Sequence, residues 1–75
     1  MIAVCQGRNR AFVLGPGDEI SVSDQSVLLK NDFGRDIKRQ RVLGVYDSEE
    51  RAAEAFHEAI GKAPSKGGLI VFPEE

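Results

Sequence analysis

Residues 43–61 read Leu-Gly-Val-Tyr-Asp-Ser-Glu-Glu-Arg-Ala-Ala-Glu-Ala-Phe-His-Glu-Ala-Ile-Gly, and this stretch decides the fold. Its first residues have the composition of a strand. The alanine-rich remainder repeats its apolar residues at the spacing of an amphipathic helix. Every other apolar segment of the chain has the length of a short strand. We therefore expect one helix, over about residues 48–60, to close the core.

Both ends of this helix carry sequence signals. Asp47 can accept from the unpaired N–H groups of the first turn, and Glu50 can reach back to it in a capping box. Gly61 is a typical C-terminal residue, and Pro64 prevents the helix from continuing. The expected buried stripe comprises Ala52, Ala53, Phe56, Ala59, Ile60 and Ala63.

The other apolar segments predict strands on both sides of the helix. They cover residues 2–5, 10–14, 19–23, 26–30, 36–46 and 68–72. The resulting order is β-β-β-β-β-α-β. We predict a single α+β domain, residues 1–75, in which the helix packs on a curved antiparallel sheet of five to six short strands.

Length and cysteine content set limits on how the chain is stabilised. A domain of 75 residues buries only ~60% of the surface that its unfolded chain exposes. One cysteine excludes an internal disulfide and fits a reducing, cytoplasmic setting. We expect neither a signal peptide nor a membrane span, because the start lacks a basic segment and no apolar run approaches ~18 residues. A homodimer is the expected source of added stability.

The net charge of −2 is unevenly distributed. Residues 35–41 contain four cations and one carboxylate, whereas residues 47–62 contain five carboxylates and two cations. A basic arm and an acidic helix can attract a second copy of the chain as readily as nucleic acid. The overall balance is too acidic for a general nucleic-acid binder.

Groups suited to catalysis or metal binding are scarce. Cys5 and His57 are the only residues able to form a thiol–imidazole pair, and their spacing does not bring them together. We expect Cys5 to be a buried small hydrophobe and His57 a partly exposed helix residue. A zinc site needs about four thiolate or imidazole ligands. The sequence therefore predicts a protein that is not an enzyme, with no catalytic residue, cofactor or metal.

Three glutamates, Glu50, Glu54 and Glu58, form an acidic ridge at helical spacing. Such a ridge can bind a cation or a basic partner. The favoured interpretation is a solvated face, in which Arg51 pairs with Glu54 and Lys62 with Glu58.

The predicted hairpin at residues 33–41 carries the candidate binding site. Its members combine one aromatic residue with four cations: Phe33, Arg35, Lys38, Arg39 and Arg41. This composition is typical of a nucleic-acid contact or a protein hot spot. Three interpretations stay open, namely nucleic acid, another protein, and a hairpin that is solvated or packed on a neighbouring subunit's acidic helix. Because both alternating faces of residues 38–41 are polar, we expect this part to have no core to cover.

Over nearly its full length the chain resembles a group of small uncharacterised β-rich, one-helix proteins of Gram-positive bacteria, their phages and conjugative elements. The matching residues are Met1–Val4, Leu43–Ala52 and Phe72–Glu75. The chain departs from that group at Gly15–Asp18, where the group has an Asn/Asp-rich turn. The resemblance implies a fold and a mobile-element setting but no activity.

A second, partial resemblance covers residues 41–73, which are similar to the C-terminal half of the AP2 DNA-binding domain. It is carried by Leu43–Ser48, by Ala52–Phe56 with its three alanines and phenylalanine, and by Phe72-Pro73. That domain reads DNA with arginine and tryptophan side chains on its sheet, and the helix supports the sheet. This chain has no tryptophan and lacks the corresponding first strand, so the resemblance covers the scaffold half.

These observations predict a non-enzymatic module that acts by stoichiometric binding to a protein partner, as a homodimer, in the cytoplasm and of phage or mobile-element type. One alternative is a DNA-binding module that uses the basic hairpin 33–41. A second alternative is a small-ligand or nucleotide binder at a subunit interface. A membrane partner is not expected.

Overall fold

The computed structural model describes residues 1–15, 17–32 and 38–74, and gives the backbone alone for residues 31, 32, 38 and 39. Five strands, one α-helix and a last strand follow one another, which confirms the predicted α+β class and element order. The elements are β1 (Ile2–Val4), β2 (Ala11–Val13), β3 (Glu19–Ser23), β4 (Ser26–Asp32), β5 (Lys38–Val45), α1 (Glu49–Lys62), the 3-10 helix η1 (Pro64–Lys66) and β6 (Leu69–Val71).

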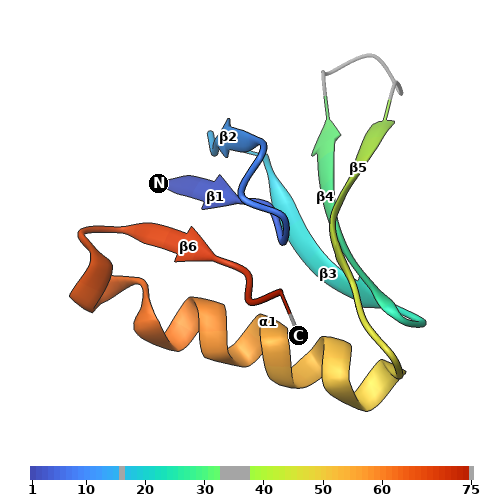
Figure 1. Cartoon of the computed structure of the whole chain (residues 1–75). Helices are drawn as coiled ribbons and strands as arrows, with labels where there is room; N and C mark the ends of the chain where they lie inside the picture. The colour runs from blue at the N-terminus through green and yellow to red at the C-terminus, as the bar shows by residue number, and fades with distance from the viewer. Residues whose placement is uncertain (16, 33–37, 75) are drawn as a thin grey trace.

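The strands form two three-stranded sheets instead of the single antiparallel sheet expected. One sheet has the order β2-β1-β6 and the other β3-β4-β5 (Figure 1). All pairs are antiparallel except β1 and β6, which run parallel. A parallel pair needs a crossover connection, and α1 with η1 carries the chain back before β6. The periodicity of each strand alone does not reveal this division.

The helix begins and ends slightly later than predicted. Its N-cap is Ser48, which has an extended φ of −152° and whose Oγ accepts from the N–H of Arg51 at 3.1 Å. The predicted cap, Asp47, lies one residue earlier, so the expected capping box is absent. Gly61 lies inside the helix, and Gly67 instead takes the left-handed conformation, with φ 67°, after η1.

The core lies between α1 and the inner faces of the two sheets. Four alanines on one side of α1 and its C-cap are buried, namely Ala52, Ala55, Ala59 and Ala63. The largest fully buried side chains are Val27, Leu29, Leu43 and Phe72. Small alanine side chains let the helix backbone approach the strands, and α1 contacts β3, β4 and β6.

The predicted buried stripe of α1 is correct for three of its six members and needs correction for the others. Phe56 and Ala53 are half-buried, and Ile60 is exposed. Ala55, which was not included, is fully buried. The stripe is therefore centred on the small side chains, since the close packing of the helix leaves the larger ones at its margins.

Candidate functional site

The predicted hairpin site is only partly described by the structure. Phe33 and Arg35 lie outside the described residues, and Lys38 and Arg39 are seen as backbone at the start of β5. The β4–β5 ladder extends to the pair Asp32–Lys38, at the end of the strands that points away from α1 (Figure 1). Whether these side chains form one surface therefore stays a prediction.

Arg41 is the one predicted site residue whose side chain is described, and it has a structural contact. It lies opposite Leu29 in the β4–β5 ladder, so its side chain leaves the sheet on the face that carries the core. Its guanidinium carbon lies 5.1 Å from the centre of the Phe12 ring on β2, a cation–π distance. The expectation that residues 38–41 have nothing to cover is therefore wrong at Arg41, which joins the two sheets.

A second cation belongs to the same neighbourhood. Arg10 precedes Phe12 by two residues, so strand alternation puts both on the same side. Arg10 is close enough to Cys5 to lower the pKa of that thiol, although burial, the larger effect, raises it. Arg41 thus places one positive charge over the Phe12 ring, and Arg10, two residues before Phe12, adds a second near Cys5.

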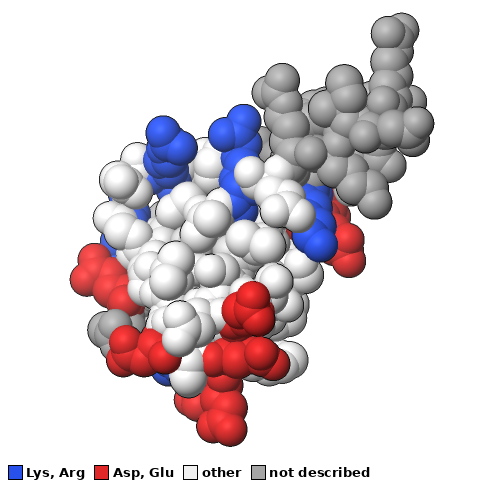
Figure 2. Space-filling model, turned by 90° about the vertical axis from the view of Figure 1, so that its right-hand side faces the viewer, with Lys and Arg blue, Asp and Glu red and all other residues white. Residues whose placement is uncertain are grey.

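Charge is segregated on the side of the molecule drawn in Figure 2. Most of the blue Lys and Arg atoms gather in the upper half, and most of the red Asp and Glu atoms gather in the lower half. White, uncharged surface covers the centre of this view, and blue meets red at its edges. Three of the four cations in residues 35–41 have side chains outside the described part of the chain, so the basic arm stays a prediction.

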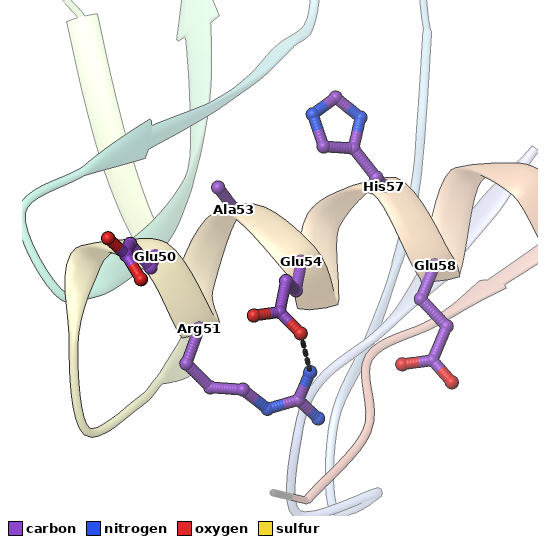
Figure 3. A pocket seen from close by; sticks show the side chains of 6 residues that line it. All are labelled: Glu50, Arg51, Ala53, Glu54, His57 and Glu58. Carbon is purple, nitrogen blue, oxygen red and sulfur yellow. Dashed lines mark ion pairs between the residues drawn. The ribbon is translucent and has the colours of Figure 1, made fainter.

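The acidic ridge on α1 is solvated, as predicted. A shallow depression on the helix surface is lined by Glu50, Arg51, Ala53, Glu54, His57 and Glu58. Figure 3 shows these side chains fanning out from the helix without converging on a common point. Both expected pairs form: Arg51 with Glu54 at 3.9 Å, and Lys62 with Glu58 at 2.9 Å. The hydrogen bond from Lys62 lowers the pKa of Glu58.

The thiol and the imidazole are placed as the sequence predicts. Cys5 is buried after β1, and burial raises the pKa of its thiol. His57 is on the exposed side of α1 and makes an edge contact with Phe56, with ring centres 5.4 Å apart. Within residues 1–15, 17–32 and 38–74, no three His, Cys, Asp or Glu side chains are grouped to hold a metal ion.

The most distinctive surface was not predicted. It is the face of the β2-β1-β6 sheet that points away from the core, which we call the outer sheet face. Register places six side chains on it in two rows across the strands. The rows are Val13, Ile2 and Leu69, then Ala11, Val4 and Val71. Every one of the six is aliphatic.

Several of these side chains are exposed to solvent. Val13 is 79% exposed, Leu69 38% and Ile2 37%. The opposite face of the same strands carries Ala3 and Ile70, which are buried in the core. A sheet with apolar side chains on both faces is typical of strands that are covered on both sides. In this chain the core covers the inner face of the β2-β1-β6 sheet, and the outer sheet face stays exposed.

The sequence does contain a signal for this surface. Residues 2–5, 11–14 and 69–72 are unbroken apolar runs, whereas β3 alternates apolar residues with Glu19, Ser21 and Ser23. Alternation is typical of a strand with one solvent-exposed face, and an unbroken apolar run is typical of a strand that is buried on both faces. The runs by themselves predict only strands, because a run three or four residues long does not show which face meets the helix.

Comparisons with known proteins give no assignment. No family model matches the chain, and neither the curated proteins nor the solved structures contain a significant match. The two sequence resemblances described above therefore stay predictions. Among the residues that the structure describes, no helix combines the length and apolarity needed to cross a membrane.

Proposed function

We propose that this protein is a non-enzymatic binding module that binds a protein partner stoichiometrically through the outer sheet face. The observation that supports this proposal is the unbroken aliphatic patch across β2, β1 and β6, whose most exposed member is Val13. Contiguous exposed apolar surface on a small protein is typical of interaction sites. Burying this patch against a partner removes apolar surface from water, and this favours binding.

The chemistry of the patch favours a protein over other ligands. A small-molecule site needs a few placed polar groups to orient its ligand, and the six side chains of the outer sheet face carry none. Nucleic acid is bound through phosphate contacts to cations and through polar contacts to bases. Aliphatic side chains on strands best complement another aliphatic surface.

The experiment compares two valines on different sheets. The tagged chain is expressed in its native host, and bound proteins are identified for wild type, Val13→Glu and Val42→Glu. Val42 lies on β5 and is 55% exposed, so it controls for adding a charge to an exposed strand. We expect Val13→Glu to lose a partner that wild type and Val42→Glu retain. Equal recovery of that partner by all three would contradict the proposal.

DNA binding through the hairpin is the second candidate function. The observation that favours it is the approach of Arg41 to the Phe12 ring on β2, with Arg10 two residues before that phenylalanine. These cations would extend the charge of Lys38 and Arg39 towards β2. Backbone phosphates are the groups such a cluster would bind.

The setting of the protein is proposed from the sequence. The resemblance to small phage and conjugative-element proteins supports a mobile-element setting, and the lone cysteine supports the cytoplasm. The genes beside the coding sequence test the first point. A neighbourhood of unrelated housekeeping genes in the host would count against it.

A further inference from the structure

We propose that the free edge of β2 pairs with the same edge of a second copy of this chain, so that two three-stranded sheets join into one six-stranded sheet. This inference uses the backbone N–H and C=O groups of β2. These groups are separate from the aliphatic side chains of the outer sheet face, so the inference goes beyond the proposed function. The reason for it lies in how the four edge strands of the two sheets, β2, β6, β3 and β5, are protected.

Three of the four edge strands have a neighbour or a charge that protects them from pairing. α1 contacts both β6 and β3, and a helix over an edge strand is a common protection. The C-terminal half of β5 is bonded by Gln6, whose N–H donates to the Leu43 carbonyl and whose side-chain amide pairs with the backbone of Val45. The other half of β5 is rich in cations, and charged residues also protect an edge strand.

β2 differs from the other three edge strands. It borders its sheet on the side away from β6 and α1 (Figure 1). Its residues, Ala11, Phe12 and Val13, include no charge and no proline. Ala11 is exposed, and Val13 is 79% exposed. An exposed edge strand without charge or proline is a template for pairing with another strand.

Hydrogen bonds show which backbone groups of β2 point outward. The N–H of Leu14 donates to the Met1 carbonyl at 2.8 Å, and the carbonyl of Arg10 accepts from the residue after β1 at 2.9 Å. Because the antiparallel pattern repeats every two residues, the even-numbered residues of this strand face β1. The N–H and C=O groups of Ala11 and Val13 therefore point away from β1. In the part of the chain that the structure describes, these groups have no hydrogen-bond partner.

These outward groups match those of a second copy when the two-fold axis passes beside Phe12. In an antiparallel pair centred there, Ala11 lies opposite Val13 of the second copy, and such a pair exchanges two hydrogen bonds. The symmetric pair does the same, so every outward group of both strands is used. A pair centred on Val13 would bring Ala11 opposite Gly15 instead, and the Gly15 N–H already donates to the Asp18 carboxylate at 2.6 Å.

The side chains agree with this register. Phe12 lies opposite Phe12 of the second copy in a pair without hydrogen bonds, where side chains are closest, and aromatic pairs across strands are stabilising. Arg10 lies opposite Leu14, so no like charges meet. On the outer side Val13 lies beside Ala11 of the second copy. The two outer sheet faces thereby join into one aliphatic surface.

A proline at position 11 tests the pairing. Ala11→Pro removes an outward N–H and none that bonds β1, and proline is tolerated on an edge strand. Ala11→Ser keeps the N–H and is the matched control. In sedimentation equilibrium we expect wild type and Ala11→Ser to show twice the 8.2 kDa chain mass. Ala11→Pro loses half of the intermolecular hydrogen bonds, so its dimer should be roughly 5- to 150-fold weaker. A wild-type monomer at high concentration would overturn the proposal, and so would an Ala11→Pro variant that dimerises like wild type.

Amide hydrogen exchange of wild type decides the question if the proline variant does not fold. The amides of Ala11 and Val13 should exchange more slowly as the protein concentration increases, because their N–H groups are bonded only in the dimer. The Phe12 amide faces β1 and should exchange slowly at every concentration. Rapid exchange of the Ala11 and Val13 amides at concentrations where the chain is a dimer would place the contact elsewhere and refute the edge pairing.

The edge pairing and the proposed function fail in different ways. Val13→Glu changes the outer sheet face but leaves the backbone groups of β2 in place, so this variant should still dimerise. If the chain is a monomer but Val13→Glu loses a host protein, the binding face stands and the edge pairing is wrong. If Ala11→Pro abolishes the dimer but Val13→Glu retains every host protein, the edge pairing stands and the proposed use of the face is wrong.

Discussion

The side-chain amide of Gln6 pairs with the backbone of Val45 as a neighbouring strand would. Its Nε2 donates to the Val45 carbonyl at 2.9 Å, and its Oε1 accepts from the Val45 N–H at 3.0 Å. The same Nε2 donates to the carbonyl of Glu74, and the backbone N–H of Gln6 donates to Leu43. One residue therefore connects the end of β1 with β5 and with the segment after β6.

Replacing Gln6 should destabilise the fold more than its exposure suggests. Gln6→Glu removes the amide donor, so the carbonyls of Val45 and Glu74 lose their partner, and the new carboxylate repels them. We expect a loss of about 1–3 kcal/mol in the free energy of unfolding, measured by urea denaturation. Gln40→Ala on the exposed part of β5 is the control and should stay within about 0.5 kcal/mol of wild type. Equal stability of the two variants would show that the Gln6 bridge contributes little.

Two glycines should respond to alanine in opposite directions. A Cβ at Gly44 would lie 2.9 Å from Cε2 and from the hydroxyl oxygen of Tyr46. That hydroxyl donates to the Pro73 carbonyl at 2.7 Å, so the Tyr46 ring cannot move aside without breaking this hydrogen bond. Gly44→Ala should therefore lower stability by about 1–3 kcal/mol.

At Gly61 a Cβ would meet no atom within 4 Å, and the residue lies inside α1. Gly61→Ala should therefore raise stability by about 0.5–1 kcal/mol. Thermal melts of both variants test the pair of predictions. A destabilised Gly61→Ala would place the true helix end at this glycine, as the sequence alone predicted.

The fold was largely predictable, because its main signals are local. The alanine-rich stretch, the proline after it and the strand-length apolar runs predict the helix and the element order. The cap was misplaced because Asp47 and Ser48 are both good caps and only the backbone conformation separates them. The division into two sheets depends on contacts between β1 and β6, which lie at opposite ends of the chain.

The candidate site was less predictable. The hairpin cations attract attention as a local cluster, but Arg41 contacts Phe12, almost thirty residues away, which no local pattern reveals. The outer sheet face is assembled from three separate runs. Each run is apolar on both faces of its strand. Only the register shows that Val13, Ile2 and Leu69 form one row.

Cys5 should make stability depend on pH in the alkaline range. Burial raises the pKa of this thiol in the folded state above its ordinary value. The unfolded chain therefore loses the thiol proton first, and stability decreases as pH increases from the ordinary thiol pKa towards the raised one. Urea midpoints of wild type and Cys5→Ala across this range measure the effect. We expect a steeper decline for wild type, and parallel curves would contradict it.

The DNA-binding alternative has a direct test. Fluorescence anisotropy with duplex and single-stranded DNA is measured over a range of salt for wild type, Arg39→Ala/Arg41→Ala and Lys66→Ala. If the hairpin binds phosphates, the double variant should bind more weakly with a shallower salt dependence, and Lys66→Ala should match wild type. Thermal melts establish that loss of the Arg41–Phe12 contact leaves the fold intact. The absence of salt-sensitive binding by wild type would remove this alternative.

Solvent access to individual methyl groups tests most directly the claim that the outer sheet face binds a protein partner. Methyl NMR spectra of the wild-type chain are recorded with a soluble paramagnetic probe, with and without the host partner that Val13→Glu is expected to lose. In the single chain Val13 is more exposed than Val42 or Val45, at 79% against 55% and 53%. We predict the reverse in the complex, with the methyls of Val13, Ile2 and Leu69 protected and those of Val42 and Val45 attenuated. Strong attenuation of Val13 in the complex would contradict the claim.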